Sequence, residues 1–188
     1  MNTTPLHPAL VHLPLGVAAV MPLLAAGLAW AVWTDRLPVR AWLLAIGFQG
    51  LLLGGALVAM RTGEGDEDRV EDLVGHAALH LHESMAEQFV WAVGITLALA
   101  LLVPFVKRGA ALPLMAATVA GTLVVVGAGV RVGHAGGELV YVHGAASAYA
   151  SDARGSTDAR AASEPPAASQ ALASTGRAGS GGGTDRGR

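Results

Sequence analysis

Four long apolar segments constrain the fold of this chain more than any other feature of its sequence. They cover residues 13–33, 41–60, 89–106 and 110–130. Each is close to the length of about 20 residues that an α-helix needs to cross the hydrocarbon core of a bilayer. The chain has 53% hydrophobic and only 14% charged residues, which is too apolar for an ordinary soluble domain. We therefore expect an all-α protein, a four-helix transmembrane bundle surrounded by the lipid bilayer.

The absence of cysteine limits the chemistry available to this chain. Disulfides, thiolate metal sites, iron–sulfur clusters and covalently attached c-type haem all require cysteine, so a cofactor would have to be held by His, carboxylate or Met. The formal net charge of -2 provides no basic face for nucleic acid. The sequence also lacks a phosphate-binding glycine loop and the His-Glu-x-x-His motif of zinc hydrolases. We expect neither a nucleic-acid partner nor an autonomous enzymatic activity.

Two further segments accompany the four spans. Residues 61–72 are acidic, and residues 70–87 repeat apolar side chains at helical spacing, which predicts an amphipathic interfacial helix that continues into the third span. Its apolar positions are Val70, Val74, Ala77, Leu81 and Met85. Residues 148–188 are rich in Ala, Gly, Ser and Arg without periodicity, which predicts a disordered C-terminal tail. The expected domains are a membrane domain, residues 1–147, and this tail.

Four crossings bring all the histidines to one side of the membrane. The start of the first span, the end of the second, the start of the third and the end of the fourth share that side, where the seven histidines lie. The opposite side has two short turns that carry Arg36, Arg40, Lys107 and Arg108. Short basic turns are typical of the cytoplasmic side. We therefore expect the cell inner membrane, with extracytoplasmic termini and histidines, and an interfacial belt formed by Trp30, Trp33 and Trp42.

Three of the histidines border the apolar segments directly. His7 and His12 flank the start of the first span. An imidazole there either ligates a metal or haem iron, or hydrogen-bonds the free N–H groups of the helix start. His82 falls at the edge of the apolar arc of the interfacial helix, from where its side chain could point into the bundle.

The segment after the fourth span contains a second candidate feature. The Gly136-Gly137 pair permits a sharp reversal of the chain, which would fold residues 139–143 back over the mouth of the bundle. Glu138 and His143 would then cover or ligate a site. The alternative is a surface turn whose His143 and Tyr141 anchor it in the lipid headgroups.

A polar stripe follows the interfacial helix on the side opposite its apolar face. It consists of His76, His80, Glu83 and Glu87 at positions i, i+4, i+7 and i+11. Two histidines four residues apart on a helix form a competent chelate for zinc, copper or nickel, and neighbouring carboxylates complete the ligand shell. The alternative is a solvated polar face without a ligand.

Four short motifs resemble those of a known family. They are Leu6-His7-Pro8-x-x-Val11-His12-x-Pro14, Thr62-Gly63, His82-Glu83, and Gly136-Gly137-Glu138-Leu139-Val140-Tyr141-x-His143-Gly144. Over roughly residues 5–147, the chain resembles the bacterial four-helix inner-membrane proteins catalogued as domain of unknown function 2231. The resemblance implies a four-span protein without an established activity, and some relatives joined to cytochrome-type domains. It supports His7, His12, His82 and His143 as functional positions, but not His76 or His80.

The leading functional hypothesis from the sequence is a membrane redox or electron-transfer module. It would hold a b-type haem at the extracytoplasmic mouth of the bundle, with His12 and His82 as ligands and His143 and His7 as further candidates. Its expected partner is an extracytoplasmic redox protein or a quinone. Two alternatives stay open: a divalent-metal binding or transport protein that uses the polar stripe, and a cofactor-free structural or partner-binding membrane protein.

Overall fold

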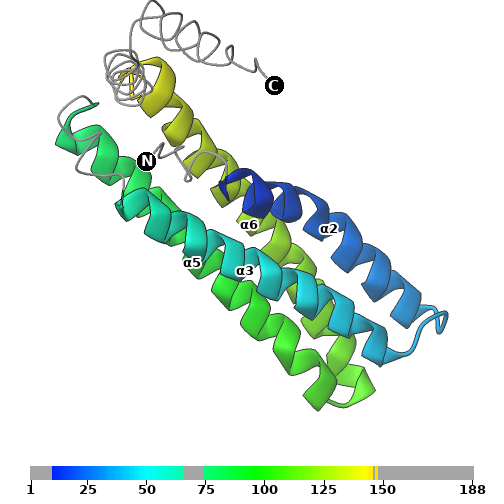
Figure 1. Cartoon of the computed structure of the whole chain (residues 1–188). Helices are drawn as coiled ribbons and strands as arrows, with labels where there is room; N and C mark the ends of the chain where they lie inside the picture. The colour runs from blue at the N-terminus through cyan, green and yellow to red at the C-terminus, as the bar shows by residue number, and fades with distance from the viewer. Residues whose placement is uncertain (1–9, 66–73, 146, 148–188) are drawn as a thin grey trace, which may run out of the picture. The chain divides into compact units, whose positions relative to one another are not determined.

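The computed structural model describes residues 10–65, 74–145 and 147, and the elements among these residues are all helices, without any strand (Figure 1). In chain order the elements are α2 (His12–Trp33), η1 (Val39–Trp42), α3 (Leu43–Glu64), α5 (His76–Leu102), η2 (Val103–Phe105) and α6 (Arg108–Tyr141). Four stretches are long and apolar enough to cross a membrane: His12–Trp33, Val39–Glu64, His76–Phe105 and Arg108–Tyr141. The predicted all-α, four-span architecture is confirmed. His7 and the expected tail, residues 148–188, lie outside the described residues.

The four long helices form a closed ring of neighbours. Helix α2 packs against α3 and α6, and α5 also packs against α3 and α6 (Figure 1). Because the connections between α2 and α3 and between α5 and α6 are short, successive helices run antiparallel. The histidine-bearing ends of α2, α5 and α6 and the C-terminal end of α3 therefore meet at one end of the bundle, which we call the histidine end. The other end, with Arg36, Arg40, Lys107 and Arg108, is the basic end.

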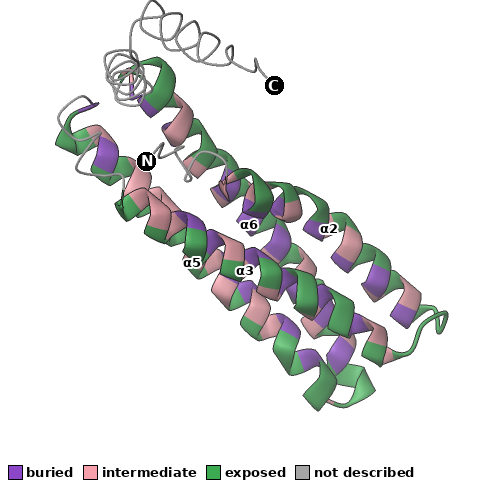
Figure 2. Cartoon of the chain, viewed as in Figure 1, coloured by how far each residue is buried: buried purple, intermediate pink, exposed green. Residues whose placement is uncertain are grey.

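The two larger apolar clusters of buried side chains are separated by a polar layer, and buried positions occur along all four long helices (Figure 2). The cluster nearer the basic end includes Trp42, Val103 and Met115, and the next one toward the histidine end includes Met21, Phe89 and Val125. Between them lie the buried polar side chains of the described residues, which are Gln49, Thr96, Thr118 and Thr122. The Gln49 Nε2 donates to the Val93 carbonyl at 3.3 Å, and each threonine hydroxyl donates to a carbonyl of its own helix. This bonding limits the cost of placing polar groups within the membrane.

The interface between α5 and α6 repeats one contact three times. Side chains of α5 at seven-residue spacing rest on glycines of α6: His82 on Gly136, Phe89 on Gly129 and Thr96 on Gly121. A methyl group added to Gly121 would lie 2.7 Å from the Thr96 Oγ1, and one added to Gly129 would lie 3.3 Å from the Phe89 ring. Small residues at such positions let two membrane helices approach closely. The repeat sets the register of α5 against α6.

The start of the third helix differs from the sequence prediction. Helix α5 begins at His76 and continues into the span as expected, but Gly75 has φ +80° and separates Val74 from it. The buried residue of the first turn is Leu79, whereas Leu81, predicted on the apolar face, is 52% exposed. Leu79 rather than Leu81 is therefore the buried residue at the start of α5, although Val74 of the predicted apolar face is buried as well. The reason is tertiary, because Leu79 packs with Val74 and with Leu139 of α6.

The prediction of a chain reversal at Gly136-Gly137 is wrong. Helix α6 runs through both glycines to Tyr141, because Gly136 is used to admit the His82 ring rather than to make a turn. The reversal comes at Gly144, which has φ +75°, as left-handed glycines commonly do at helix ends. There the Ala145 N–H donates to the Leu139 carbonyl at 3.0 Å.

The expected tryptophan belt is only partly present. Trp30 and Trp33 are exposed, at 49% and 65%. Trp42 is completely buried instead, and its Nε1 donates to the Ala100 carbonyl at 3.2 Å. It joins η1 to α5 inside the bundle, where a buried indole needs such an acceptor.

Candidate metal and cofactor sites at the histidine end

Six histidines fall within the described residues, and all belong to the histidine end. They are His12 at the start of α2, His76, His80 and His82 in the first two turns of α5, and His134 and His143 at or just after the last turns of α6. The antiparallel order of the helices places them there, as the sequence predicts. They do not form one cluster, however, and each group has its own surroundings.

His76 and His80 are in direct contact on the exposed side of α5. Their Nε2 atoms lie 2.9 Å apart, and their rings meet edge to face with centroids 4.1 Å apart. On the other side of the His80 ring, Nδ1 lies 3.1 Å from the Glu83 Oε2. The start of α5 at His76 makes this possible, because residues three and four apart share a face of a helix.

The contacts of His80 with Glu83 and His76 determine which nitrogen of the His80 ring carries the proton. A carboxylate only accepts hydrogen bonds, so Glu83 assigns the Nδ1 proton to His80 and leaves a lone pair on its Nε2. In the described ranges no three His, Asp or Glu side chains converge on one point, because the two nitrogens of His80 face opposite neighbours. Glu87 is exposed, and the structure does not bring it to the pair. The stripe thus provides a two-imidazole chelate with an orienting carboxylate.

His82 has a different environment from the other two histidines of α5. It is half-buried, and its Cε1 would lie 3.1 Å from a methyl group added to Gly136. The prediction that His82 points into the bundle is confirmed. Two positions from separate motifs of the resemblance therefore meet in one contact between α5 and α6.

His12 opens an apolar groove beside α2. The groove has a volume of about 390 Å³ and is lined by His12, Leu13, Gly16, Val17, Val20, Met21, Leu24 and Phe48. His12 is exposed, and no side chain caps the start of α2 within the described part of the chain. The helix-capping alternative for His12 is thus not observed. His82 is not part of the groove lining, so the two preferred haem ligands do not face this groove together.

The last two histidines lie on the surface of α6 and its end. His134 Nε2 is 3.3 Å from Glu138 Oε1, a pair that sequence analysis missed because it expected a turn at Gly136. Recognition that the helix continues would have revealed the pair through its i, i+4 spacing. His143 is exposed, and its backbone N–H donates to the Glu138 carbonyl at 3.1 Å. It does not fold over the mouth of the bundle.

Comparisons with protein-family models, with curated proteins and with solved structures found no match to this chain. The resemblance to the family with domain of unknown function 2231 stays a prediction.

Proposed function

We propose that this chain, with its four helices of membrane-spanning length, is a multi-pass membrane protein that binds a divalent transition-metal ion through His76 and His80. The observation that carries the proposal is the contact of the two imidazoles on adjacent turns of α5, whose Nε2 atoms are hydrogen-bonded at 2.9 Å. Imidazole is a ligand that suits zinc, copper and nickel, and two imidazoles held on adjacent turns of a helix bind as a chelate. The remaining coordination positions would be filled by water or by a ligand from a partner.

The donor set also bears on which metal is preferred. The affinity of imidazole sites for divalent ions rises from Ni²⁺ to Cu²⁺ and falls again at Zn²⁺. The hydrogen bond between the two Nε2 atoms would be replaced by two metal–nitrogen bonds. We therefore expect Cu²⁺ to bind most tightly.

Glu83 supports the same chemistry from behind His80. In metal sites, the ring nitrogen that does not bind the metal commonly donates to a carboxylate, which fixes the tautomer and raises the basicity of the ligand. The 3.1 Å contact between His80 Nδ1 and Glu83 Oε2 supplies this arrangement before a metal arrives. Glu83 is an orienting residue rather than a ligand.

The surroundings favour metal binding over metal transport. The pair is exposed at the histidine end, and the buried polar residues among the described parts of the spans are one glutamine and three threonines, without a charged side chain. Ion pathways through membranes are usually marked by ionisable residues that face the bundle interior. A binding or delivery role on the extracytoplasmic side is therefore the better supported proposal.

The first experiment measures binding of Cu²⁺, Ni²⁺ and Zn²⁺ by isothermal titration of the full chain in mild detergent. We expect one ion per chain, with Cu²⁺ bound most tightly, and loss of this binding in His76→Ala and His80→Ala. His134→Ala is the matched control, because His134 is also exposed and has a carboxylate partner but no second imidazole. Unchanged binding in the double variant of His76 and His80 would refute the proposal.

A b-type haem is the second candidate, favoured by the apolar groove that His12 opens. An apolar surface beside an imidazole suits the hydrophobic edge of a haem. Among the described residues, the groove offers only His12 as a ligand to the haem iron, since His82 packs on Gly136 and is outside the groove lining. Protein purified from haem-replete cells would show sharp reduced α and β bands, lost in His12→Ala, if this candidate is right. A featureless spectrum of the folded protein would exclude it.

A further inference from the structure

A second groove lies between α2 and α6 at the basic end, far from the histidines along both helices. It has a volume of about 430 Å³, and its lining consists of Ala26, Ala29, Trp30, Trp33, Leu112, Ala116 and Val119. The small side chains of the three alanines leave space for the groove, and the two tryptophans line it on α2. The groove is shallow and open, and its lining is mostly apolar.

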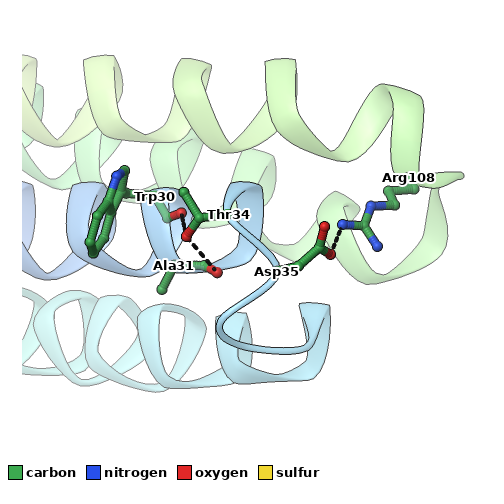
Figure 3. A network of polar contacts seen from close by, with 5 residues as sticks. All are labelled: Trp30, Ala31, Thr34, Asp35 and Arg108. Atoms are coloured by element: carbon green, nitrogen blue, oxygen red, sulfur yellow. Dashed lines mark hydrogen bonds and ion pairs between the residues drawn. The ribbon is translucent and has the colours of Figure 1, made fainter.

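A cation is held at the end of this groove. The Arg36 guanidinium lies 4.2 Å from the centroid of the Trp30 ring, which is within the range of a cation–π contact. The backbone at this point is fixed, because the Arg36 N–H donates to the Ala31 carbonyl at 2.9 Å. The Thr34 hydroxyl also donates to the Trp30 carbonyl at 2.9 Å (Figure 3). Arg36 is therefore placed beside a residue that lines the groove.

In the part of the chain that the structure describes, the carboxylate next to Arg36 is paired with a different arginine. Asp35 pairs with Arg108, which joins the turn after α2 to the first turn of α6 (Figure 3). Arg108 precedes the groove residue Leu112 by four positions, so it lies on the same side of α6. Its charge is neutralised by Asp35, whereas Arg36 is exposed and forms no ion pair within the described residues. The end of the groove thus has a net positive charge.

We propose that this groove binds an anionic phospholipid, with an acyl chain along the apolar lining and the phosphate against Arg36. Guanidinium groups bind phosphate oxygens through paired N–H donors, and basic residues near a membrane surface attract anionic lipids. The groove supplies the shape for a chain, and Trp30 holds the guanidinium at the depth of the headgroup. The site is independent of the metal pair, which lies at the opposite end of the bundle.

The test is native mass spectrometry of the full chain released from nanodiscs of phosphatidylglycerol or phosphatidylcholine with identical acyl chains. We expect phosphatidylglycerol, but not phosphatidylcholine, to remain bound to the wild type. Arg36→Ala should lower the retained fraction several-fold, and Arg40→Ala, a basic residue of η1 away from the groove lining, should not. Equal retention of both lipids, or equal loss in the two arginine variants, would overturn the proposal.

Two further variants separate the groove from the charge. Ala116→Phe fills the groove from an exposed position, whereas Ala117→Phe adds the same bulk at an exposed position outside the lining; only the first should lower retention. Asp35→Asn frees Arg108 and should increase retention, and Asn tolerates the φ of +56° at this position. Displacement of the lipid by inorganic phosphate would show that a free anion, and not a lipid, is the ligand.

Discussion

The three histidines of α5 differ in what their side chains contact. The imidazole ring of His82 covers Gly136 and occupies the same seven-residue repeat as Phe89 and Thr96. The contact gives this histidine a packing role between α5 and α6, which is compatible with the cofactor-free alternative. His76 and His80 differ, because they are exposed and hydrogen-bond each other.

We predict that Gly136→Ala destabilises the protein by about 1–3 kcal/mol, the usual cost of adding a methyl group to a packed site. The added methyl would lie 3.1 Å from the His82 Cε1. Gly137→Ala is the control, because nothing lies within 4 Å of its added methyl, and it should be neutral or slightly stabilising. Thermal unfolding in detergent measures both. If His82→Ala does not reduce the cost of Gly136→Ala, the contact is not its cause.

The proposed metal site of His76 and His80 leads to a prediction at the same scale for Glu83→Gln. The amide keeps the size of the side chain but removes the charge that fixes the proton on His80 Nδ1. Loss of such an orienting partner typically costs about 10–100-fold in metal affinity. Isothermal titration with Cu²⁺ should show a loss near the lower bound, since the site is exposed, and Glu87→Gln should leave the affinity unchanged. Equal effects of the two variants would argue against an orienting role for Glu83.

At the scale of elements, the residue at which α5 begins sets which of its first residues face α6 and which face away from it. Gly75, with φ +80°, is the N-cap of the helix that begins at His76. From that start, Leu79 packs on Leu139 of α6, while His76, His80 and Glu83 share another side of α5. The buried contact and the proposed metal site thus both belong to the first two turns of α5.

We expect Gly75→Ala to destabilise the protein by about 1–2 kcal/mol, because a side chain in the left-handed region clashes with its own backbone. Gly65→Ala is the matched control, since Gly65 ends α3 with φ −69° and its added methyl would make only ordinary contacts. Thermal unfolding of the two variants compares them directly. A cost for Gly65→Ala as large as that for Gly75→Ala would show that backbone strain is not the reason.

At the scale of the whole molecule, the two ends of the bundle differ in chemistry. One end carries the six described histidines, and the other carries Arg36, Arg40, Lys107 and Arg108 on short turns. The positive-inside tendency would place the basic end in the cytoplasm. The proposed lipid site would then contact the anionic inner leaflet, and the proposed metal site would take ions from outside.

The absence of cysteine allows a direct test of this orientation. We predict that His134→Cys, at an exposed position of the histidine end, is labelled in intact cells by a membrane-impermeant maleimide. Arg40→Cys, at an exposed position of the basic end, should be labelled only after lysis. The reverse pattern would place the histidines in the cytoplasm and invert the proposed localisation of both termini.

Apolar length and charge spacing, read along the sequence, determined the four spans, their antiparallel order and the gathering of the histidines at one end. These follow from local chemistry, because a bilayer demands about 20 apolar residues per crossing wherever the helix packs. The sequence also placed His76, His80 and Glu83 on one stripe through helical spacing alone. The absence of cysteine, which excludes disulfides and thiolate metal sites, is likewise evident from the sequence alone.

Only the tertiary structure decided which faces were buried and where the chain turned. Leu79 is buried whereas Leu81 is exposed, and Trp42 lies in the core rather than at the interface. Gly136 contacts the His82 ring instead of making a turn. A glycine permits both a turn and a close approach, and a span that is apolar on every side does not indicate which side meets another helix. Contacts with neighbouring helices settle these choices, and they depend on residues far apart in the chain.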